Sequence, residues 1–558
     1  MSHQNSFHNR RGLPALVAIL VMALLAPAAA FAGGAAQTAA APEVAVNPAG
    51  TFPIVDEQIT ITVFRSQDPL ILDFDDNYQT QWMQDKTNIR VDWMLTPAQQ
   101  MVERLNLMLA AGTDLPDVFM TGIANPTLQR YGQEGIFVPL NDYIDQYGYE
   151  INTVMRDLED VGIDFLSAYS ALDGNIYGLP SVNTCRWCET TYRAWVYVPW
   201  LERLDLEIPT TVDEFTDMLR AFKTRDPNQN GLADEIPLMG GRTGWGAQVE
   251  GFLMFPFVVY NPGDRLILDR DTGKITAAYT LPEYFEGIRY IRSLVEEGLL
   301  DPISLTQTNQ EHKVMGEADP VVVGTHLGSN HVWLTLVDDK YTQYEAITPL
   351  KGVDTGIPQT FRNAYQPLGN AAAAISSSAA NPAAIFRWIE FQYSYDNSML
   401  SRYAREGIDW VSADAGTTGP FGHPAVFREV GQWGSPTRNS NRQMFQYLSY
   451  DLLNGLQMTD PQGVPVNSDA YYVLRTPKYA DNAIGNSVPR VFMEPREVDE
   501  YGELLANLNT YVTESFARFV TGDLPLTAWD SFQAEVRHIG VDRLIEMTER
   551  AYRRQYMD

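Results

Sequence analysis

Polar and apolar residues alternate along the first part of the chain in the way that half-buried strands require. Residues 58–64 and 88–93 alternate, and 117–120 is a short apolar run, so we predict three strands. Helical patterns over 70–85 and 97–112 lie between these strands. This order predicts an α/β fold with a parallel sheet covered by helices, and ligands of such sheets lie beyond the carboxyl ends of the strands.

A second set of strands and helices begins near residue 194. Residues 194–201 predict a strand that leads into a helix, and Thr211 and Glu214 form the capping box of the next helix. The remaining pattern predicts strands at 321–326, 344–350 and 368–375, and helices at 281–298, 381–391, 500–519 and 541–556.

The composition is that of a globular protein with an acidic surface. The chain has 558 residues, of which 45% are hydrophobic, and this length allows two or more cores. Its formal net charge of −30 argues against nucleic acid and against an anionic membrane surface as partners, because both are themselves negatively charged.

The N-terminus predicts export. Two arginines precede an apolar stretch over 13–25, and Ala30-Phe31-Ala32 offers a cleavage site, so we predict a signal peptide over 1–32. The apolar stretch is too short to span a bilayer, and an uncleaved anchor is the alternative. No cysteine lies near the cleavage site, so we expect no lipid anchor and no membrane insertion after cleavage. Residues 33–50 are rich in Ala, Gly and Pro and predict a flexible leader.

The chain has two cysteines, Cys185 and Cys188. In an exported protein, a disulfide is the first interpretation of this pair. A redox-active pair would require a helix N-terminus at the motif, and zinc would require two more ligands. The surrounding residues indicate a loop, and the histidines of the mature chain are scattered.

Oxygen-bearing side chains are concentrated between Thr224 and Leu238, with Gly231 at a turn position. This pattern predicts a Ca²⁺ site of structural rather than ligand-binding role. A regular EF-hand would have a Glu at the position of Pro237, so we predict a related loop on another scaffold. An Asx-rich surface turn is the alternative. The predicted ligands are the side chains of Asp226, Asn228, Asn230, Asp234 and Glu235 and the carbonyl of Leu232.

Several segments carry a resemblance to a known family. Residues 106–118, 173–180 and 199–215 resemble segments of the extracellular solute-binding proteins of ABC importers, in their oligosaccharide-binding branch. Arg387-Trp388 and the stretch from Tyr403 to Trp410 resemble a later signature of this family. The calcium loop is similar to that of alginate-binding members.

The resemblance implies a type II periplasmic-binding-protein-like fold, in which two α/β lobes are joined by a hinge of several crossings. We assign lobe one to 51–180 with 345–378, and lobe two to 181–344 with 379–558. The implied function is capture of an oligosaccharide in an interlobe cleft and its delivery to a membrane permease. The implied protein is a secreted monomer, in the periplasm or at the cell surface.

A sugar cleft combines aromatic rings with planar hydrogen-bonding groups. Tryptophans in Gly-rich or polar segments are our candidates for stacking, although each is as compatible with packing. Arg362 would favour a ligand with carboxylates. The candidate ligand-binding residues are Asn183, Trp187, Trp245, Arg362, Trp410 and Trp433.

Two alternatives stay open. A secreted glycosidase or lyase would need only a carboxylate pair, and the 70 acidic residues provide many. No hydrolase, metalloprotease or phosphate-loop motif is present, and we predict no catalytic residue. A peptide-binding protein on the same scaffold is the other alternative.

Overall fold

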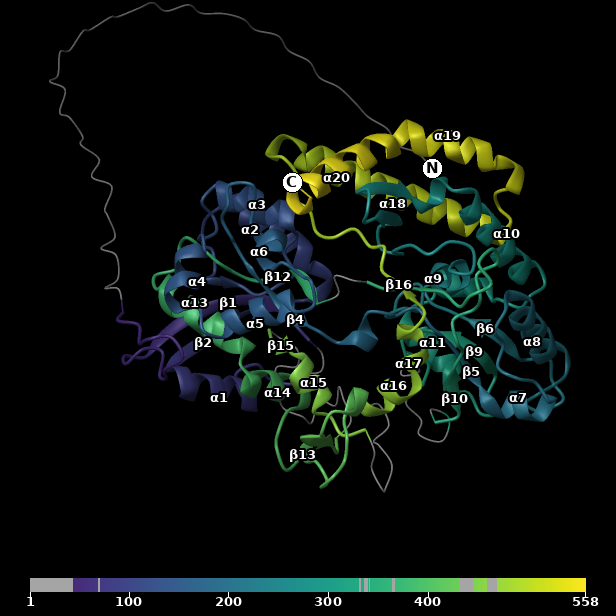
Figure 1. Ribbon diagram of the computed structural model, residues 1–558, viewed down its shortest axis with the longest axis horizontal. Helices are drawn as coiled ribbons and strands as arrows, with labels where there is room; N and C mark the ends of the chain where they lie inside the picture. Colours follow the sequence, from purple (N-terminus) through teal and green to yellow (C-terminus); the bar gives the residue numbers. More distant parts are fainter. Residues whose placement is uncertain are drawn as a thin grey trace, which may run out of the picture. The chain divides into compact units, whose positions relative to one another are not determined.

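The computed structural model describes residues 44–68, 71–330, 333–335, 340, 342–363, 367–431, 445–458 and 469–557 (Figure 1). Residues 44–558 form one compact unit. The predicted signal peptide and the first part of the predicted leader lie outside the described residues. Within the described residues, no helix is both long and apolar enough to cross a membrane.

The first sheet contains the three strands that the alternating pattern predicts. Its strand order is β15-β4-β12-β3-β1-β2. β1 pairs in parallel with β2 and β3, as the strand–helix–strand order predicts, whereas β12 runs antiparallel to β3 and β4. The strands are β1 (Ile59–Ser66), β2 (Ile89–Thr96), β3 (Val118–Phe119), β4 (Leu179–Asn183), β12 (Leu368–Ile375) and β15 (Tyr447–Leu448).

Helices from two parts of the chain surround the first sheet, which with them forms lobe one. One hydrophobic core unites these strands with the helices, except that Met399 and Tyr403 of the last helix belong to a separate cluster. The predicted helix over 97–112 is confirmed and ends at Gly112, whose φ of 63° favours glycine. The helices are α1 (Tyr78–Thr87), α2 (Met101–Ala111), α3 (Asn125–Gln133), α4 (Asn141–Tyr147), α5 (Glu150–Glu159), α6 (Phe165–Tyr169), α13 (Pro382–Glu390) and α14 (Tyr395–Tyr403).

Three assigned boundaries differ from the structure. Ile347 and Leu350, assigned to lobe one, lie in the core of lobe two. We assigned 379–558 to lobe two, but α13 buries Ile385, Phe386 and Trp388 in the core of lobe one. Residues 44–50, assigned to the flexible leader, are held against the same lobe. The guanidinium of Arg387 donates to the carbonyl oxygens of Asn47 and Pro48, at 2.6 and 2.7 Å.

The second sheet, with strand order β10-β5-β9-β6, is the centre of lobe two. β6 and β9 are parallel, and β5 is antiparallel to both of its neighbours. The strands are β5 (Ala194–Tyr197), β6 (Ile236–Met239), β9 (Val323–Leu327) and β10 (Tyr344–Ala346).

The helices of lobe two come from the middle of the chain and from its C-terminal part, and all of them except Asn309–Gly316 share a second hydrophobic core. The capping box of Thr211 and Glu214 is present at the start of α8. These helices are α7 (Val198–Leu204), α8 (Val212–Thr224), α9 (Val249–Met254), α10 (Pro282–Glu296), α11 (Asn309–Gly316), α18 (Val498–Thr521), α19 (Trp529–Ile539) and α20 (Val541–Tyr556).

Small elements complete the fold. Three two-stranded sheets pair β7 with β8, β11 with β16, and β13 with β14. A third hydrophobic cluster packs α15 and α16 around the cysteine pair. The bounds are β7 (Leu266–Asp269), β8 (Lys274–Ala277), β11 (Thr360–Phe361), β13 (Trp410–Ser412), β14 (Phe427–Glu429), β16 (Ala483–Ile484), α15 (Tyr450–Asn454), α16 (Asp469–Arg475) and α17 (Pro477–Ala480).

The chain passes between the two lobes three times. It leaves lobe one after β4 and enters lobe two at β5, returns between β10 and β12, and crosses again between β15 and α18. The crossings are bonded to one another, because β11 of the second crossing pairs in parallel with β16 of the third. A multi-crossing connection between two α/β lobes is therefore present, as predicted.

Candidate functional site

Each lobe has a pocket at the carboxyl ends of its parallel strands, which is where α/β sheets bind ligands. In lobe one, the segments that follow β1 and β2 line a cavity of about 620 Å³, which we call the lobe-one pocket. In lobe two, the glycine-rich loop that follows β6 lines a cavity of about 530 Å³, which we call the lobe-two pocket.

An aromatic pair lines the lobe-one pocket. The rings of Phe74 and Trp93 meet edge to face, with centroids 5.7 Å apart. The guanidinium carbon of Arg65 lies 4.9 Å from the Phe74 ring centroid and 6.0 Å from that of Trp93. Arg65 is buried, and this burial lowers its pKa to about 10 although Asp68 acts in the opposite direction. Arg65 therefore supports the aromatic pair from within the lobe.

The polar lining of the lobe-one pocket consists of carboxylates and amides. Asp68, Asp73, Asp75, Gln67 and Gln99 all contribute to it. The Asp73 carboxylate accepts hydrogen bonds from the backbone N–H groups of Asp75 and Asp76, at 2.8 and 2.9 Å. These bonds lower the pKa of Asp73, so it is negatively charged at neutral pH.

The lobe-two pocket holds one of the predicted stacking residues, Trp245. This side chain is 39% exposed, and the Trp245 carbonyl accepts a hydrogen bond from the backbone N–H of Ser329, which follows β9. Gly246 has a φ of 72°, and a Cβ there would lie 2.1 Å from the carbonyl oxygen of Thr191. Glycine is therefore required for the loop to pack against the first crossing.

A buried ion pair contributes to the lining of the lobe-two pocket. Arg265 donates to both carboxylate oxygens of Glu250, at 2.6 and 2.7 Å, and the hydroxyl groups of Tyr260 and Tyr284 also donate to Glu250. Burial raises the pKa of both tyrosines, so they remain neutral donors. Because this pair satisfies its own charges, we assign it a structural role.

The structure places Arg362 and Asn183 on the crossings rather than in either pocket. Arg362 Nε donates to Glu189 Oε2 at 2.6 Å, which joins the second crossing to the first. Burial raises the pKa of Glu189, and Arg362 opposes this effect. Asn183 ends β4, and its side-chain oxygen accepts a hydrogen bond from the backbone N–H of Cys185.

Two of the predicted stacking tryptophans serve packing. Trp187 is buried in the third hydrophobic cluster, so its ring is not open to a ligand. Trp410 is half-buried against the same cluster, and its ring nitrogen donates to the carbonyl oxygen of Ala404 at 3.3 Å. Trp433 lies outside the described residues. The Gly-rich or polar context of these tryptophans did not distinguish packing from binding.

The cysteine prediction is confirmed. Cys185 and Cys188 form a disulfide, and both residues are buried beside Trp187. The bridge closes a short turn in the first crossing, directly after β4.

The predicted calcium loop joins the end of α8 to β6. The Asp234 carboxylate accepts hydrogen bonds from the amide groups of Asn228 and Asn230, and Gly231 N–H donates to Asp226. Among the described residues, no group of three or more His, Cys, Asp or Glu side chains is gathered as a metal site. However, the oxygens Asp226 Oδ1 and Glu235 Oε1 are buried without a hydrogen-bond partner, which fits a cation-binding loop.

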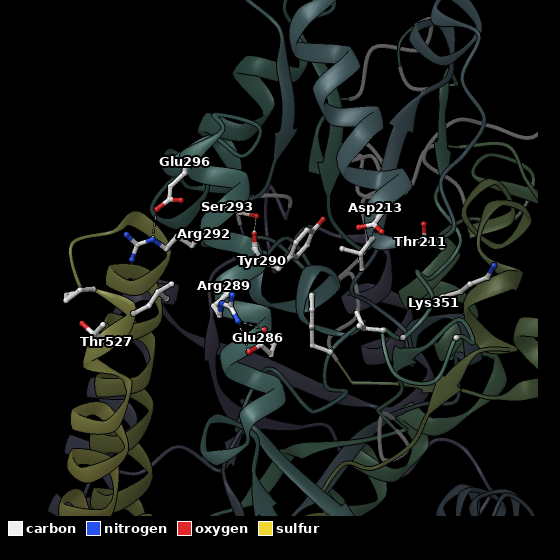
Figure 2. Close-up of a pocket in the computed structure, with 17 residues that line it drawn as sticks. Thr211, Asp213, Glu286, Arg289, Tyr290, Arg292, Ser293, Glu296, Lys351 and Thr527 are labelled. Carbon is white, nitrogen blue, oxygen red and sulfur yellow. Dashed lines mark hydrogen bonds and ion pairs between the residues drawn. The ribbon is translucent and has the colours of Figure 1, made fainter.

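A larger cavity of about 900 Å³ lies on the helical flank of lobe two (Figure 2). Residues of α10 face the start of α8 and the turn that contains Lys351 across this cavity. Figure 2 shows that the charged groups that α10 contributes pair with one another: Arg289 with Glu286, and Arg292 with Glu296. The cavity is lined by helices and turns rather than by strand ends, so we do not assign the ligand site to it.

Two α/β lobes, joined by three crossings and carrying a pocket at the strand ends of each, define a two-lobed binding protein. The sequence agrees, because the family model of bacterial extracellular solute-binding proteins matches residues 69–399. The chain belongs to this family.

Curated relatives match over different lengths. The fructooligosaccharide ABC transporter substrate-binding protein FusA of Streptococcus pneumoniae is 26% identical over 96% of this chain and 97% of its own. The polygalacturonan/rhamnogalacturonan-binding protein YtcQ of Bacillus subtilis is 26% identical over 48% of this chain and 50% of its own.

Solved structures show the same fold. FusA in complex with kestose, and a FusA EF-hand mutant in complex with fructo-nystose, each give a TM-score of 0.72 at 22% identity, covering 89% of this chain and 99% of FusA. The alginate-binding protein AlgQ2 without calcium ion gives a TM-score of 0.66 at 21% identity, covering 89% of this chain and 98% of AlgQ2.

Sequence reasoning did not identify the aromatic pair of the lobe-one pocket. One signal for Trp93 was available, because it occupies the same alternating face as Ile89 and Val91 near the carboxyl end of a predicted strand. No comparable signal marks Phe74, which lies in a turn before α1 rather than in the predicted helix over 70–85.

Proposed function

We propose that this protein captures an oligosaccharide between its two lobes, at the lobe-one and lobe-two pockets, and delivers it to the permease of an ABC transporter. The observation that carries the proposal is that a pocket of each lobe combines aromatic rings with side-chain amide groups, and in lobe one with carboxylates as well. Sugars present apolar faces to rings and hydroxyl groups to planar polar side chains. FusA is a fructooligosaccharide-binding protein and YtcQ a polygalacturonan/rhamnogalacturonan-binding protein, which supports a carbohydrate ligand.

In this proposal the protein is an exported monomer that binds without catalysis. The predicted signal peptide over 1–32 supports export, and the permease is the partner that the family resemblance implies. The hinge of three crossings would allow the lobes to close on the ligand.

A thermal-shift screen tests the proposal. The exported protein is heated with members of an oligosaccharide library, and each positive sample is analysed for cleavage products by chromatography. We expect a rise in Tm with intact sugar, because a ligand of the native state stabilises it by mass action. Cleavage products would indicate a carbohydrate-active enzyme, and the absence of any shift across the library would contradict oligosaccharide binding.

We also propose that the loop 226–235 binds Ca²⁺ through the residues that the sequence predicts. The donor set is hard oxygen, as Ca²⁺ requires. Burial raises the pKa of Glu235, and the nearby carboxylates of Asp226 and Asp234 add to this effect. Bound Ca²⁺ would supply the positive charge that offsets this repulsion. The EF-hand mutant of FusA and the calcium-free structure of AlgQ2 support a calcium site in relatives.

A further inference from the structure

The charges of the pockets indicate the class of sugar that the protein takes. We propose that the ligand is an uncharged oligosaccharide and that the carboxylates of the lobe-one pocket exclude uronic-acid oligosaccharides; this inference rests on the proposed function. Sequence likeness leaves the choice open, because FusA is a fructooligosaccharide-binding protein and YtcQ is a polygalacturonan/rhamnogalacturonan-binding protein.

The lobe-one pocket is lined by three carboxylates and, among the described residues, by no cationic side chain. Backbone N–H groups keep Asp73 ionised, and Asp75 is exposed at the same turn. A uronate in this pocket would place its negative charge beside like charges, whereas a neutral sugar can donate its hydroxyl protons to them.

Arg65 does not offset this charge for a ligand. Its guanidinium lies against the rings of Phe74 and Trp93, and its Nη1 is buried without a hydrogen-bond partner. Arg65 does not line the pocket, so it does not offer a ligand the two-pronged contact by which arginine binds carboxylates. Its charge partly balances Asp68, which raises the pKa of Arg65 against the effect of burial.

The other arginines near the site are mostly committed to carboxylates of the protein itself. Arg265 binds Glu250 with two hydrogen bonds, and Arg362 binds Glu189. Arg242 is an exposed cation that lines the lobe-two pocket, whereas three carboxylates line the lobe-one pocket. Arg362, which we considered for an acidic ligand, donates its Nε–H to Glu189 and lines neither pocket.

Calorimetric titration tests this inference directly. The exported protein is titrated with neutral tri- and tetrasaccharides (fructans, galactans and xylans) and with oligogalacturonates and oligomannuronates, at low and high NaCl. We expect a neutral sugar to bind at least tenfold more tightly than any uronate, with little dependence on salt. A uronate that binds as tightly as the best neutral sugar would overturn the inference but keep the proposed function. Binding of neither class would defeat the proposed function itself.

A charge-reversal pair locates the effect. Asp75→Lys should raise the ratio of the affinity for uronates to the affinity for neutral sugars by at least tenfold. Asp75→Asn should raise this ratio by a smaller factor. Asp160→Lys makes the same change of charge at an exposed position of lobe one outside the pocket, and it should leave this ratio unchanged. An unchanged ratio in both Asp75 variants, with melting curves that show folded protein, would overturn the role of these carboxylates.

Discussion

At the residue scale, burial separates the side chains that are open to a ligand from those that hold the protein's own structure together. Trp245 and Trp187 both lie in sequence contexts typical of loops, yet one lines a pocket and the other fills a hydrophobic cluster. Arg65, Arg265 and Arg362 each contact an aromatic ring or a carboxylate of the protein. The chemistry left for a ligand therefore consists mainly of aromatic faces, amides and carboxylates.

Glu390 makes a testable contribution to the dependence of stability on pH. Burial raises the pKa of this carboxyl to about 7, although the backbone N–H groups of Tyr149 and Glu150 donate to it. The folded-state pKa lies above the unfolded one, so its contribution is complete below about pH 4.5 and is lost as the pH rises through 7. The full effect is about 3 kcal/mol.

We therefore expect the free energy of unfolding to fall between pH 5 and pH 8 by more in the parent protein than in Glu390→Gln, whose side chain does not titrate. Urea unfolding at both pH values measures this difference. An equal change in the free energy of unfolding between pH 5 and pH 8 in the two proteins would show that Glu390 does not titrate in this range.

Gly246 and Gly162 form a matched pair of glycines with positive φ. An added Cβ would meet the Thr191 carbonyl at Gly246 and nothing within 4 Å at Gly162. Gly162→Ala should cost about 1 kcal/mol, from backbone conformation alone, and Gly246→Ala should cost more. Only Gly246→Ala should also weaken sugar binding, because it moves the loop of Trp245. Denaturant unfolding and titration of both variants check this, and equal losses of stability would contradict the packing argument.

At the element scale, the proposed calcium loop joins the end of α8 to β6, whose carboxyl end leads into the glycine-rich loop of the lobe-two pocket. A cation bound by residues 226–235 would therefore hold β6 and the glycine-rich loop in place and would not itself contact the ligand. This placement agrees with the structural role that the sequence analysis assigns to the loop.

Asp226→Ala should lower Tm in the presence of calcium and abolish the dependence of Tm on calcium. The reason is that a cation bound only to the native state stabilises it, and the variant lacks one carboxylate ligand. Melting curves with calcium and with a chelator measure the effect. A parent protein whose Tm is the same with calcium and with chelator would contradict the calcium proposal.

Local patterns predicted most elements, because alternation, helical periodicity and capping are local properties. β12 was predicted at its observed bounds, and the capping box of α8 is present. The helix predicted over 381–391 begins one residue later, and Asn381 at its N-cap position makes no cap bond, since its side chain accepts a hydrogen bond from Val44 N–H instead. The lobe assignment of α13 and the burial of Trp187 depend on contacts between distant segments, which no local pattern contains.

At the scale of the whole molecule, hydrogen bonds between the crossings hold the connection of the two lobes together. Arg362 belongs to the second crossing and contacts both others: its side chain binds Glu189 and its backbone N–H donates to Ile484. A hinge whose crossings are hydrogen-bonded to one another is compatible with lobes that move as rigid bodies while each pocket keeps its shape. In the proposed function, ligand binding depends on both pockets together.

The most direct test of this account is a titration of three proteins with the oligosaccharide that stabilises the parent in the screen. Trp93→Ala removes a ring from the lobe-one pocket, and Trp245→Ala removes one from the lobe-two pocket. We predict that each substitution weakens binding about tenfold or more while the protein stays folded, because the sugar contacts both lobes. Parent-like affinity in either variant would contradict capture between the two lobes.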